Sequence, residues 1–344
     1  MLLSEFRPKP VLVTKETQIE HPRFPVIDAH NHLAAIFKHN WERKPVNSLI
    51  DEMDKSNIHI YVDLDGGWGE DILERHLDYF KKYAPERFRI FGGIDWNRWT
   101  EMGNNFPEWA SKSLCKQVAR GADGLKIWKN FGLHIKDDKG NLVSVEDSRL
   151  DCIWETAGEL KIPIVIHIAD PVAFFTPLDE FNERYEELIA NPGWQFLSPP
   201  FPPFIKLVEG LANIVERHPE TIFIGAHVGC YAENLNWVGN LIDRCPNFYV
   251  DISGRLGELC RQPYTSRKFF MDHADRILFG TDLGPAPENY RKYFRFLETA
   301  DEYFNYSVEE IPQEGRWGGY GIFLEDKYLE KIYFTNAAKI LIKD

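Results

Sequence analysis

Eight short apolar runs, almost all followed by a stretch with helical spacing, most strongly limit how this chain can fold. The runs cover residues 25–28, 58–64, 88–94, 124–128, 163–168, 221–227, 247–252 and 276–282. Strands that alternate with helices indicate a parallel sheet, and eight such units close into a barrel of about 250 residues. An open doubly wound sheet would normally show a glycine-rich phosphate turn after an early strand, and the sequence has no such motif. We therefore expect an α/β fold, a (β/α)8 TIM barrel with loop insertions over its C-terminal face.

The length of 344 residues fits one barrel domain over residues 1–344 with three additions. Residues 1–23 are polar, contain prolines and are expected to form an arm on the surface. Residues 170–203 and 307–323 exceed what barrel loops need, and both carry aromatic side chains, which argue against disorder. We expect both insertions to lie over the mouth of the barrel.

Composition excludes several classes of partner. The net charge is -13, with 53 acidic against 40 basic residues, and a polyanion attracts neither nucleic acid nor an anionic membrane surface. No apolar run approaches the roughly 20 residues of a membrane helix, and the first residues have no apolar core of signal-peptide length. The five cysteines are scattered without a Cys-x-x-Cys pair, which favours reduced thiols and a cytoplasmic location.

Four of the expected strands end in residues that can bind a metal ion. Val26-Ile27 runs into Asp28-x-His30-x-His32, and side chains alternate along a strand, so both imidazoles point the same way. His167, His227 and Asp282 end three later strands. The C-terminal strand ends of such a barrel open onto one face, so these side chains are expected to meet. Imidazoles with a carboxylate suit Zn or a similar divalent ion, and an open position would make the site catalytic.

The ordered set Asp-x-His-x-His, Lys, His, His and Asp resembles the amidohydrolase superfamily of metal-dependent barrels. It is most similar to the amidohydrolase-related branch, which includes non-oxidative decarboxylases of the aminocarboxymuconate-semialdehyde and resorcylate type. The resemblance runs from Val26 to the end of the chain, including the closing Phe-Gly-Thr-Asp and the helix near residue 336.

The resemblance implies roles for individual residues. The core metal ligands would be His30, His32, His167 and Asp282. His227 would be a second-metal ligand in a binuclear site, or a catalytic or orienting group in a mononuclear one. Lys126 matches a strand-four lysine that is carboxylated and bridges two metals in some members. Its surroundings, Gly-Leu-Lys-Ile-Trp-Lys, look more like the branch with one metal, where this lysine contacts substrate. One Zn2+ per chain is the expectation, with Mn2+ as the alternative.

These residues predict a metal-dependent hydrolase of a small lactone, amide or ester. Asp282 would accept the proton of a metal-activated water, and His227 would stabilise developing negative charge. The alternative in the same fold is a metal-dependent non-oxidative decarboxylase, a carbon–carbon lyase, in which Asp282 or a histidine protonates the substrate carbon. A third hypothesis is a barrel that binds a small molecule without catalysing a reaction. Such a protein would be expected to have an incomplete set of metal ligands. A homodimer or a higher homo-oligomer is compatible with the sequence.

Further side chains are candidates for substrate contact, each with a structural alternative. Arg255 follows strand seven and could hold a carboxylate as a bidentate donor, or form a salt bridge with Asp251 or Glu258. The other candidates in this group are Lys126, Trp128, Arg316 and Trp317. Asp28 is expected to orient its neighbours rather than bind metal. The remaining histidines lie in loops or helices and are expected on the surface: His21, His39, His59, His76, His134, His218 and His273.

Overall fold

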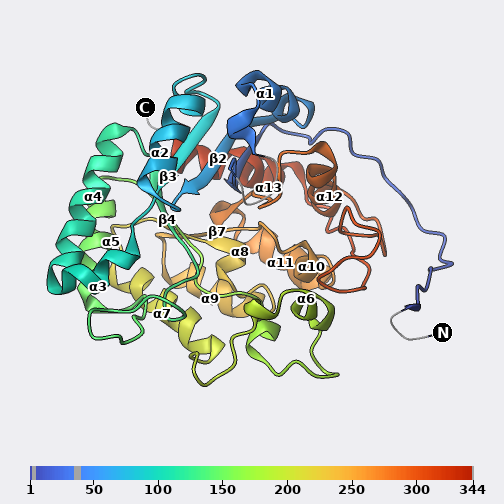
Figure 1. Cartoon of the computed structure of the whole chain (residues 1–344). Coiled ribbons are helices and arrows are strands. Elements are labelled where there is room, and N and C mark those ends of the chain that lie inside the picture. Colours follow the sequence, from blue (N-terminus) through green and yellow to red (C-terminus); the bar gives the residue numbers. More distant parts are fainter. Residues whose placement is uncertain (2–4, 35–39, 343–344) are drawn as a thin grey trace.

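A sheet of eight parallel strands, paired in chain order from β1 to β8, forms the centre of the computed structural model, which describes residues 1, 5–34 and 40–342. The strands are β1 (Val26–Asn31), β2 (Ile58–Gly66), β3 (Phe88–Gly92), β4 (Gly124–Ile127), β5 (Ile164–Ile166), β6 (Phe223–Gly225), β7 (Phe248–Asp251) and β8 (Ile277–Leu278). Figure 1 shows them surrounded by a ring of helices.

Two backbone hydrogen bonds bring the end of the sheet back to its beginning. The Ala29 N–H donates to the Phe279 carbonyl at 2.9 Å, and the Asp282 N–H donates to the His30 carbonyl at 3.0 Å. The segment after β8 therefore lies against β1, and the sheet is a nearly closed barrel. The predicted (β/α)8 TIM barrel is confirmed.

Helices follow almost every strand. The α-helices are α1 (Val46–Lys55), α2 (Glu70–His76), α3 (Trp99–Met102), α4 (Phe106–Arg120), α5 (Asp151–Glu159), α6 (Tyr185–Ala190), α7 (Phe204–Arg217), α8 (Ala226–Gly229), α9 (Leu235–Arg244), α10 (Leu256–Leu259), α11 (Pro263–Asp272), α12 (Pro287–Glu298), α13 (Asp326–Glu330) and α14 (Asn336–Leu341). The π-helical turns are η4 (Leu77–Lys81) and η11 (Lys331–Thr335), and the 3-10 turns are η3 (Trp41–Arg43), η5 (Trp96–Arg98), η6 (Gly103–Asn105), η7 (Ser148–Leu150), η8 (Val172–Phe175), η9 (Pro192–Trp194) and η10 (Ala274–Arg276).

Apolar periodicity explains how the helices pack. In α7, Leu207, Leu211 and Ile214 recur at helical spacing and are buried, whereas Lys206 and Glu209 on the other face form an exposed ion pair. Inside the barrel, alternate strand residues such as Ile27, Ile60 and Val165 pack together.

The last helix closes one end of this interior. Ala337, Ile340 and Leu341 of α14 belong to the same apolar cluster as the inward-facing strand residues. Arg89, near the start of β3, donates to the Leu341 carbonyl at 2.9 Å. Since β3 starts at that end, α14 covers the N-terminal ends of the strands, and the C-terminal ends stay available for chemistry.

Local capping sets where some helices begin. The helix α9 begins at Leu235, because the Asn234 side chain caps it by accepting from the Trp237 N–H. The helix α5 begins at Asp151, directly after the 3-10 turn η7.

The two insertions contact each other and the barrel. Residues 170–203 form η8, α6 and η9, and residues 307–323 contain no helix or strand among those above. Arg316 of the second insertion pairs with Glu186 of the first, and buried Arg184 pairs with Glu258 of α10. None of the helices in the described ranges is both long and apolar enough to cross a membrane.

Candidate metal centre

Three of the predicted ligands converge at the C-terminal face. Asp282 Oδ1 lies 3.3 Å from His32 Nε2 and 3.8 Å from His30 Nε2. One donor atom from each of these residues lies within 4.8 Å of the others. Two imidazoles and a carboxylate at this separation form a donor set of the kind that holds a divalent cation.

Local backbone geometry brings Asp282 to the histidines. Asp282 has a positive φ of 55°, which turns the chain at the end of β8 so that its N–H reaches the His30 carbonyl. Gly280 permits the close approach, because a Cβ there would lie 3.0 Å from His30 Cβ.

Buried carboxylates fix which imidazole nitrogen faces the centre. His30 Nδ1 lies 2.8 Å from Asp251 Oδ2, and His32 Nδ1 lies 2.8 Å from Asp65 Oδ1. An ionised carboxylate only accepts hydrogen bonds, so Nδ1 carries the proton in both rings. The Nε2 atoms therefore point towards Asp282, as in histidine ligands held by a second carboxylate.

His227 stands in a left-handed turn that the sequence did not reveal. His227, Val228, Gly229 and Cys230 have φ values of 58°, 59°, 63° and 62°, so α8 contains consecutive left-handed residues. Such backbone is unfavourable for residues with a Cβ, above all for β-branched Val228, and clusters at functional sites. The turn ends β6 abruptly and places the His227 imidazole over the barrel.

The His227 ring has one nitrogen free for chemistry. Its Nδ1 lies 2.8 Å from the Ser253 carbonyl oxygen, which can only accept, so Nδ1 carries the proton. Nε2 lies 3.9 Å from Asp282 Oδ2, and the ring centroid lies 4.8 Å from that of His30 and 4.4 Å from that of His167. His30, His227 and Asp251 form a second group of donor atoms within 4.8 Å.

His167 lies at the rim of the cluster. Its N–H donates to the Ile127 carbonyl at 3.0 Å, which fixes it at the end of β5. Among the described residues, Nε2 has no hydrogen-bond partner although it is buried, and Asp170 Oδ1 is 3.5 Å away. Asp170 is also bound by Lys129 at 2.6 Å. The structure therefore brings His167 against His227, but not into either tight group of donor atoms.

Lys126 is buried beside the histidines. Its Nζ lies 3.2 Å from His30 Nε2 and 4.8 Å from the centre of the Trp128 ring. Burial, only partly offset by Asp282 and Asp251, lowers the pKa of Lys126 to about 8. Trp128 in turn stacks on His32, with centroids 5.2 Å apart, and lies 4.1 Å from Trp68. Both residues adjoin the histidine–aspartate cluster.

Charge in the cluster is concentrated on few groups. Burial opposes ionisation of Asp282, but the neighbouring His30 and His32 hold its pKa well below the usual carboxyl range. Burial also opposes the charge on His32, yet hydrogen bonds to Asp282 and Asp65 raise its pKa to about 9. Burial lowers the pKa of His167 to about 4 and that of His227 well below its ordinary value. Without a cation, a proton on His32 Nε2 thus balances Asp282.

Asp28 ties strand one to strand eight, as expected for an orienting residue. Its carboxylate accepts hydrogen bonds from Asn31, Thr281 and Tyr290 at 2.7, 3.0 and 2.9 Å. Burial raises the pKa of Asp28 to about 6.

A buried histidine that we expected on the surface supports the centre from behind. His76 of α2 is fully buried; its Nδ1 lies 2.6 Å from Asp63 Oδ2 and its Nε2 lies 3.1 Å from Glu42 Oε1. Asp63 and Asp65 both accept from the Leu33 N–H, next to His32. The sequence feature that could have indicated this buried network is the i, i+2 spacing of Asp63 and Asp65, which places both carboxylates on one face of β2. His218 is also buried, against Asp151, and His39 lies outside the described residues.

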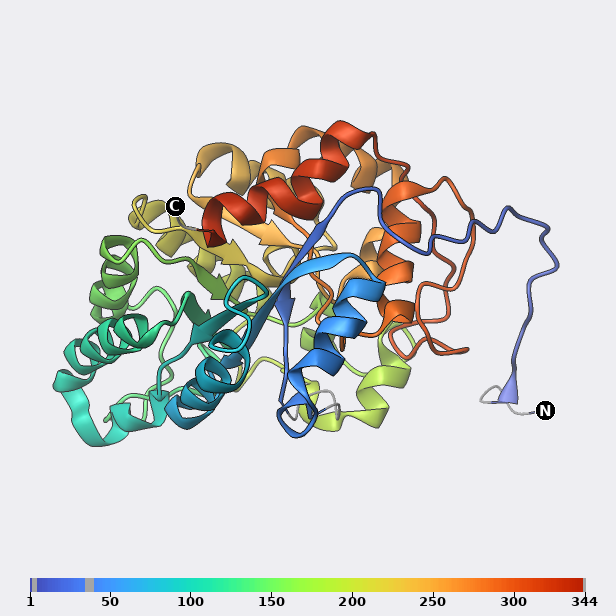
Figure 2. The same ribbon diagram turned by 90° about the horizontal axis from the view of Figure 1, so that it is seen from above.

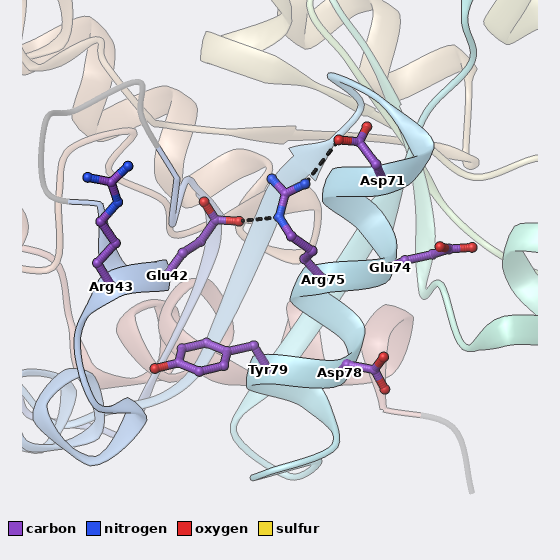
Figure 3. A pocket seen from close by; sticks show the side chains of 7 residues that line it. All are labelled: Glu42, Arg43, Asp71, Glu74, Arg75, Asp78 and Tyr79. Atoms are coloured by element: carbon purple, nitrogen blue, oxygen red, sulfur yellow. Dashed lines mark hydrogen bonds and ion pairs between the residues drawn. The ribbon is translucent and has the colours of Figure 1, made fainter.

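The outer end of this chain of contacts reaches a surface hollow. The hollow has a volume of about 700 Å³. Figure 3 shows the side chains that line it: Glu42 pairs with Arg75 of α2, and Arg75 also pairs with Asp71. The hollow lies on the outside of the barrel, not at the strand ends, and we assign no chemistry to it.

Two clefts flank the metal-ligand candidates. One, of about 820 Å³, is lined by Trp68, Trp96 and Trp128 with polar groups between them. The other, of about 280 Å³, includes Gly254 and Leu283. A Cβ at Gly254 would lie 3.6 Å from His227 Nδ1, so this cleft approaches the site from the β7 side.

The remaining candidates are held in structural contacts. The Arg255 guanidinium is buried, donates to the Gly254 carbonyl at 2.6 Å and lies among Glu258 and Glu233. Arg316 pairs with Glu186 and donates to the Phe6 carbonyl at 2.8 Å. Trp317 donates from Nε1 to the Gly257 carbonyl at 2.9 Å and stacks on Tyr306. Substrate contact by these three residues stays a prediction.

A parallel barrel with imidazoles and a carboxylate at its C-terminal strand ends defines the class of metal-dependent barrel enzymes. The family model described as Amidohydrolase matches residues 27–342. The chain belongs to this amidohydrolase family and is an enzyme; the predicted family is confirmed.

Solved structures share the fold at low sequence identity. A 2,6-dihydroxybenzoate decarboxylase from Rhizobium is 16% identical, with a TM-score of 0.55, over 92% of this chain and 98% of that one. A dihydroxybenzoic acid decarboxylase from Polaromonas, with bound manganese and the inhibitor 2-nitroresorcinol, is 16% identical with a TM-score of 0.55 over 92% and 96%. A protein named as an amidohydrolase from Staphylococcus aureus is 19% identical with a TM-score of 0.54 over 86% and 90%. A comparison with curated proteins finds no match.

Proposed function

We propose that this enzyme is a metal-dependent hydrolase of a small lactone, amide or ester. The observation that carries the proposal is the convergence of His30 Nε2, His32 Nε2 and Asp282 Oδ1, with Asp251 and Asp65 behind the two rings. Here two separate carboxylates each turn one imidazole towards a third carboxylate. A network that only balances charge does not need this arrangement, whereas a metal site does, because groups behind the ligands orient them towards the cation.

The residues present fit a divalent cation held by His30, His32, His167 and Asp282. The buried His167 Nε2, which has no hydrogen-bond partner in the part of the chain that the structure describes, could supply one more ligand atom at the edge of the cluster. A nitrogen-rich donor set suits Zn2+, with Mn2+ as the alternative, and manganese is present in a solved structure of the same fold. We favour one cation per chain, because the sequence around Lys126, Gly-Leu-Lys-Ile-Trp-Lys, resembles the branch in which this lysine contacts the substrate.

A bound cation would supply Lewis acidity, which polarises a substrate carbonyl and makes water acidic enough to lose a proton near pH 7. Asp282 Oδ1 lies 3.3 Å from His32 Nε2 and 3.8 Å from His30 Nε2, so its carboxylate could accept a proton beside the bound substrate and return it to the leaving group. Neutral His227, protonated at Nδ1, presents a lone pair at Nε2 and can accept a second proton or orient the substrate.

The clefts support a small, partly flat substrate. Trp68 and Trp128 offer apolar faces beside His32, and indole faces bind planar or sugar-like rings. Lys126 and Arg255 supply positive charge next to the ligand candidates, which favours a substrate with a carboxylate. Arg316 and Trp317 are the more remote candidates for substrate contact. We also propose that the enzyme acts in the cytoplasm.

Non-oxidative decarboxylation is the second candidate. It is supported by the decarboxylases among the solved structures that share this fold. In that reaction the bond to the carboxylate carbon breaks, its electron pair stays on the substrate, and a proton from Asp282 or a histidine replaces carbon dioxide.

Elemental analysis of the purified protein tests the proposal first. We expect close to one Zn or Mn per chain. Two cations per chain would overturn the mononuclear site and assign Lys126 as a carboxylated bridge. No binding from excess metal would overturn the centre itself.

Product analysis then separates the two reactions. Incorporation of oxygen from isotope-labelled water into the product of a lactone, amide or ester supports hydrolysis. Release of carbon dioxide from a carboxylated arene, without such incorporation, would replace hydrolysis by decarboxylation.

A further inference from the structure

The larger of the two clefts beside the metal-ligand candidates is built by the loops that follow β2, β3 and β4. Its volume is about 820 Å³. Figure 1 and Figure 2 both show α3 and α4, which follow β3 and are coloured teal, on the opposite side of the barrel from the second insertion in dark orange. The smaller cleft is lined by residues of that insertion. The two clefts are therefore separate, and the larger one has its own set of side chains.

One indole connects the larger cleft with the metal-ligand candidates. Trp128 lines the cleft and stacks on His32, with ring centroids 5.2 Å apart. Trp68 lies 4.1 Å from Trp128 between ring centroids and is 52% exposed, so part of its indole surface is open to the cleft. A substrate whose reacting group lies at the metal-ligand candidates can therefore extend past Trp128 into this space.

The backbone of the cleft is closely packed. A Cβ at Gly93 would lie 2.2 Å from Gly67 Cα, and a Cβ at Gly67 would lie 2.4 Å from Trp128 Nε1. The loops after β2 and β3 thus touch each other directly, and Trp128 packs against backbone. A wall held in this way needs little ordering when a ligand binds, which lowers the cost of binding.

The polar side chains of the cleft include amides that the protein itself does not use. Within the described chain, the side-chain amides of Asn97 and Asn130 form no hydrogen bond, and both line the cleft. An amide carries donors and an acceptor, so it can bind neighbouring hydroxyl groups. A ring without hydroxyl groups would leave both amides dehydrated and unpaired, which costs binding free energy.

The charged side chains of the cleft leave one positive charge available. Asp95 pairs with Arg98 at 3.3 Å, and Asp71 pairs with Arg75 at 3.0 Å. Lys136 also lines the cleft, is exposed, and has no ion pair with any residue that the structure describes. A ligand with a single negative charge at this position would balance it.

We propose that this cleft is a subsite for the end of the substrate that is not hydrolysed, and that this end is a hydroxylated sugar ring with one carboxylate, as in a uronic acid. Trp68 stacks on the apolar face of the ring. Asn97 and Asn130 bind hydroxyl groups, and Lys136 binds the carboxylate. The inference deepens the proposed function by naming a substrate class, but binding in the cleft itself requires no cation.

Ligand-detected NMR titration of the metal-loaded, full-length enzyme tests the charge contact. The probes are methyl β-D-glucuronide and methyl β-D-glucoside, which differ by the carboxylate. We expect the glucuronide to bind about tenfold more tightly. Lys136→Gln should abolish this preference. The matched control Lys116→Gln changes an exposed lysine on α4 and should keep it. An equal affinity for both probes, or a preference that survives in Lys136→Gln, would overturn the proposal.

The ring contacts are tested with two further comparisons. Trp68→Ala should weaken both glycosides by at least severalfold, whereas Tyr264→Ala removes an aromatic ring that is 91% exposed on α11 and should change neither. Cyclohexanecarboxylate keeps the ring and the carboxylate but has no hydroxyl groups, and it should bind more weakly than the glucuronide. Equal or tighter binding of cyclohexanecarboxylate would overturn the assignment of a hydroxylated ring, and an unchanged Trp68→Ala would place the ring elsewhere.

The variant His30→Ala separates the subsite from the proposed reaction. It should bind the glucuronide as tightly as the wild type, because its altered residue lies outside the cleft. Loss of glucuronide binding in His30→Ala would show that the probe binds at the metal centre and would overturn the subsite. Retained binding in an enzyme that hydrolyses no lactone, amide or ester would overturn the proposed hydrolysis and support the subsite.

Discussion

At the scale of single residues, the candidate site depends on which nitrogen of each imidazole carries its proton. Asp251, Asp65 and the Ser253 carbonyl each take the Nδ1 proton of a different histidine. The Nε2 atoms of His30 and His32 are thereby turned towards Asp282 before any cation binds. Such preorganisation lowers the reorganisation needed for binding.

Replacement of one ring should therefore remove the cation without unfolding the barrel. We expect His30→Ala to lose at least about 100-fold in metal affinity and all measurable turnover, because one of the convergent donors is gone. Metal content and thermal unfolding measure the two effects. The control is His21→Ala, which removes an exposed histidine and should change neither. Full metal content in His30→Ala would refute the ligand role.

At the scale of elements, the site is shaped by turns that follow the strands. The left-handed turn after β6 holds His227, and Gly254 after β7 has a φ of 57° in the space beside it. A Cβ at Gly254 would lie 3.6 Å from His227 Nδ1 and 3.9 Å from Asp282 Oδ2. These are ordinary contact distances, so there is room for a methyl group at this position. The positive φ of Gly254 nevertheless disfavours any residue that has a Cβ.

The variant Gly254→Ala tests whether the turn after β7 affects only stability or also catalysis. We expect a loss of about 1 kcal/mol in the free energy of unfolding, together with a several-fold lower kcat, because the new methyl group touches His227 and Asp282. Gly140→Ala is the matched control, since its φ is 79° and nothing lies within 4 Å of the new atom. It should lose similar stability and keep full activity. Equal kcat in both variants would show that the turn after β7 does not shape the site.

The α2 helix should make stability depend on pH through His76. Burial opposes the charge on His76, but Asp63 raises its pKa to about 9, from about 6.5 in the unfolded chain. The stabilisation is complete below pH 6.5 and is lost as pH rises through 9, by about 1–3 kcal/mol. Urea unfolding of the metal-loaded protein between pH 6 and 9.5 measures this slope. The double variant Asp63→Asn/His76→Gln removes both charges and should make the free energy of unfolding nearly independent of pH in this range. An unchanged pH dependence would show that other groups cause it.

The barrel could be predicted from the sequence because each strand is marked by a short apolar run, and this local pattern recurs eight times along the chain. All eight strands and the convergence of His30, His32 and Asp282 followed from short apolar runs that end in polar residues. The left-handed turn at His227 and the burial of His76 did not follow. The partners of His76 lie 13 residues away on β2 and 34 residues away in η3, and the residues next to His76 in the chain do not distinguish it from a surface histidine.

At the scale of the whole molecule, long-range ion pairs join the first insertion to the barrel and the two insertions to each other. Arg184 of the first insertion is 1% exposed and pairs with buried Glu258 of α10 and with Glu187. Arg316 of the second insertion pairs with Glu186 at the surface. The buried contact has no local sequence signature, because its partners are 74 residues apart.

These two ion pairs should differ strongly in strength. Arg184→Ala leaves Glu258 buried without its partner and should lower the free energy of unfolding by about 3–5 kcal/mol. Arg316→Ala breaks an exposed pair and should cost less than about 1 kcal/mol. Thermal and urea unfolding of both variants measure the difference. Similar stabilities for the two would mean that the insertion is not anchored through Arg184.

The contact between the first strand and the segment after the last one has a consequence for biosynthesis. His30 is made about 250 residues before Asp282, and the helix α14 that fills the opposite end of the barrel is made later still. A nascent chain on the ribosome therefore has the histidines but not the carboxylate that completes the site. The cation would be captured only after the whole barrel has been translated and has folded, so metal loading would mark chains with a closed barrel.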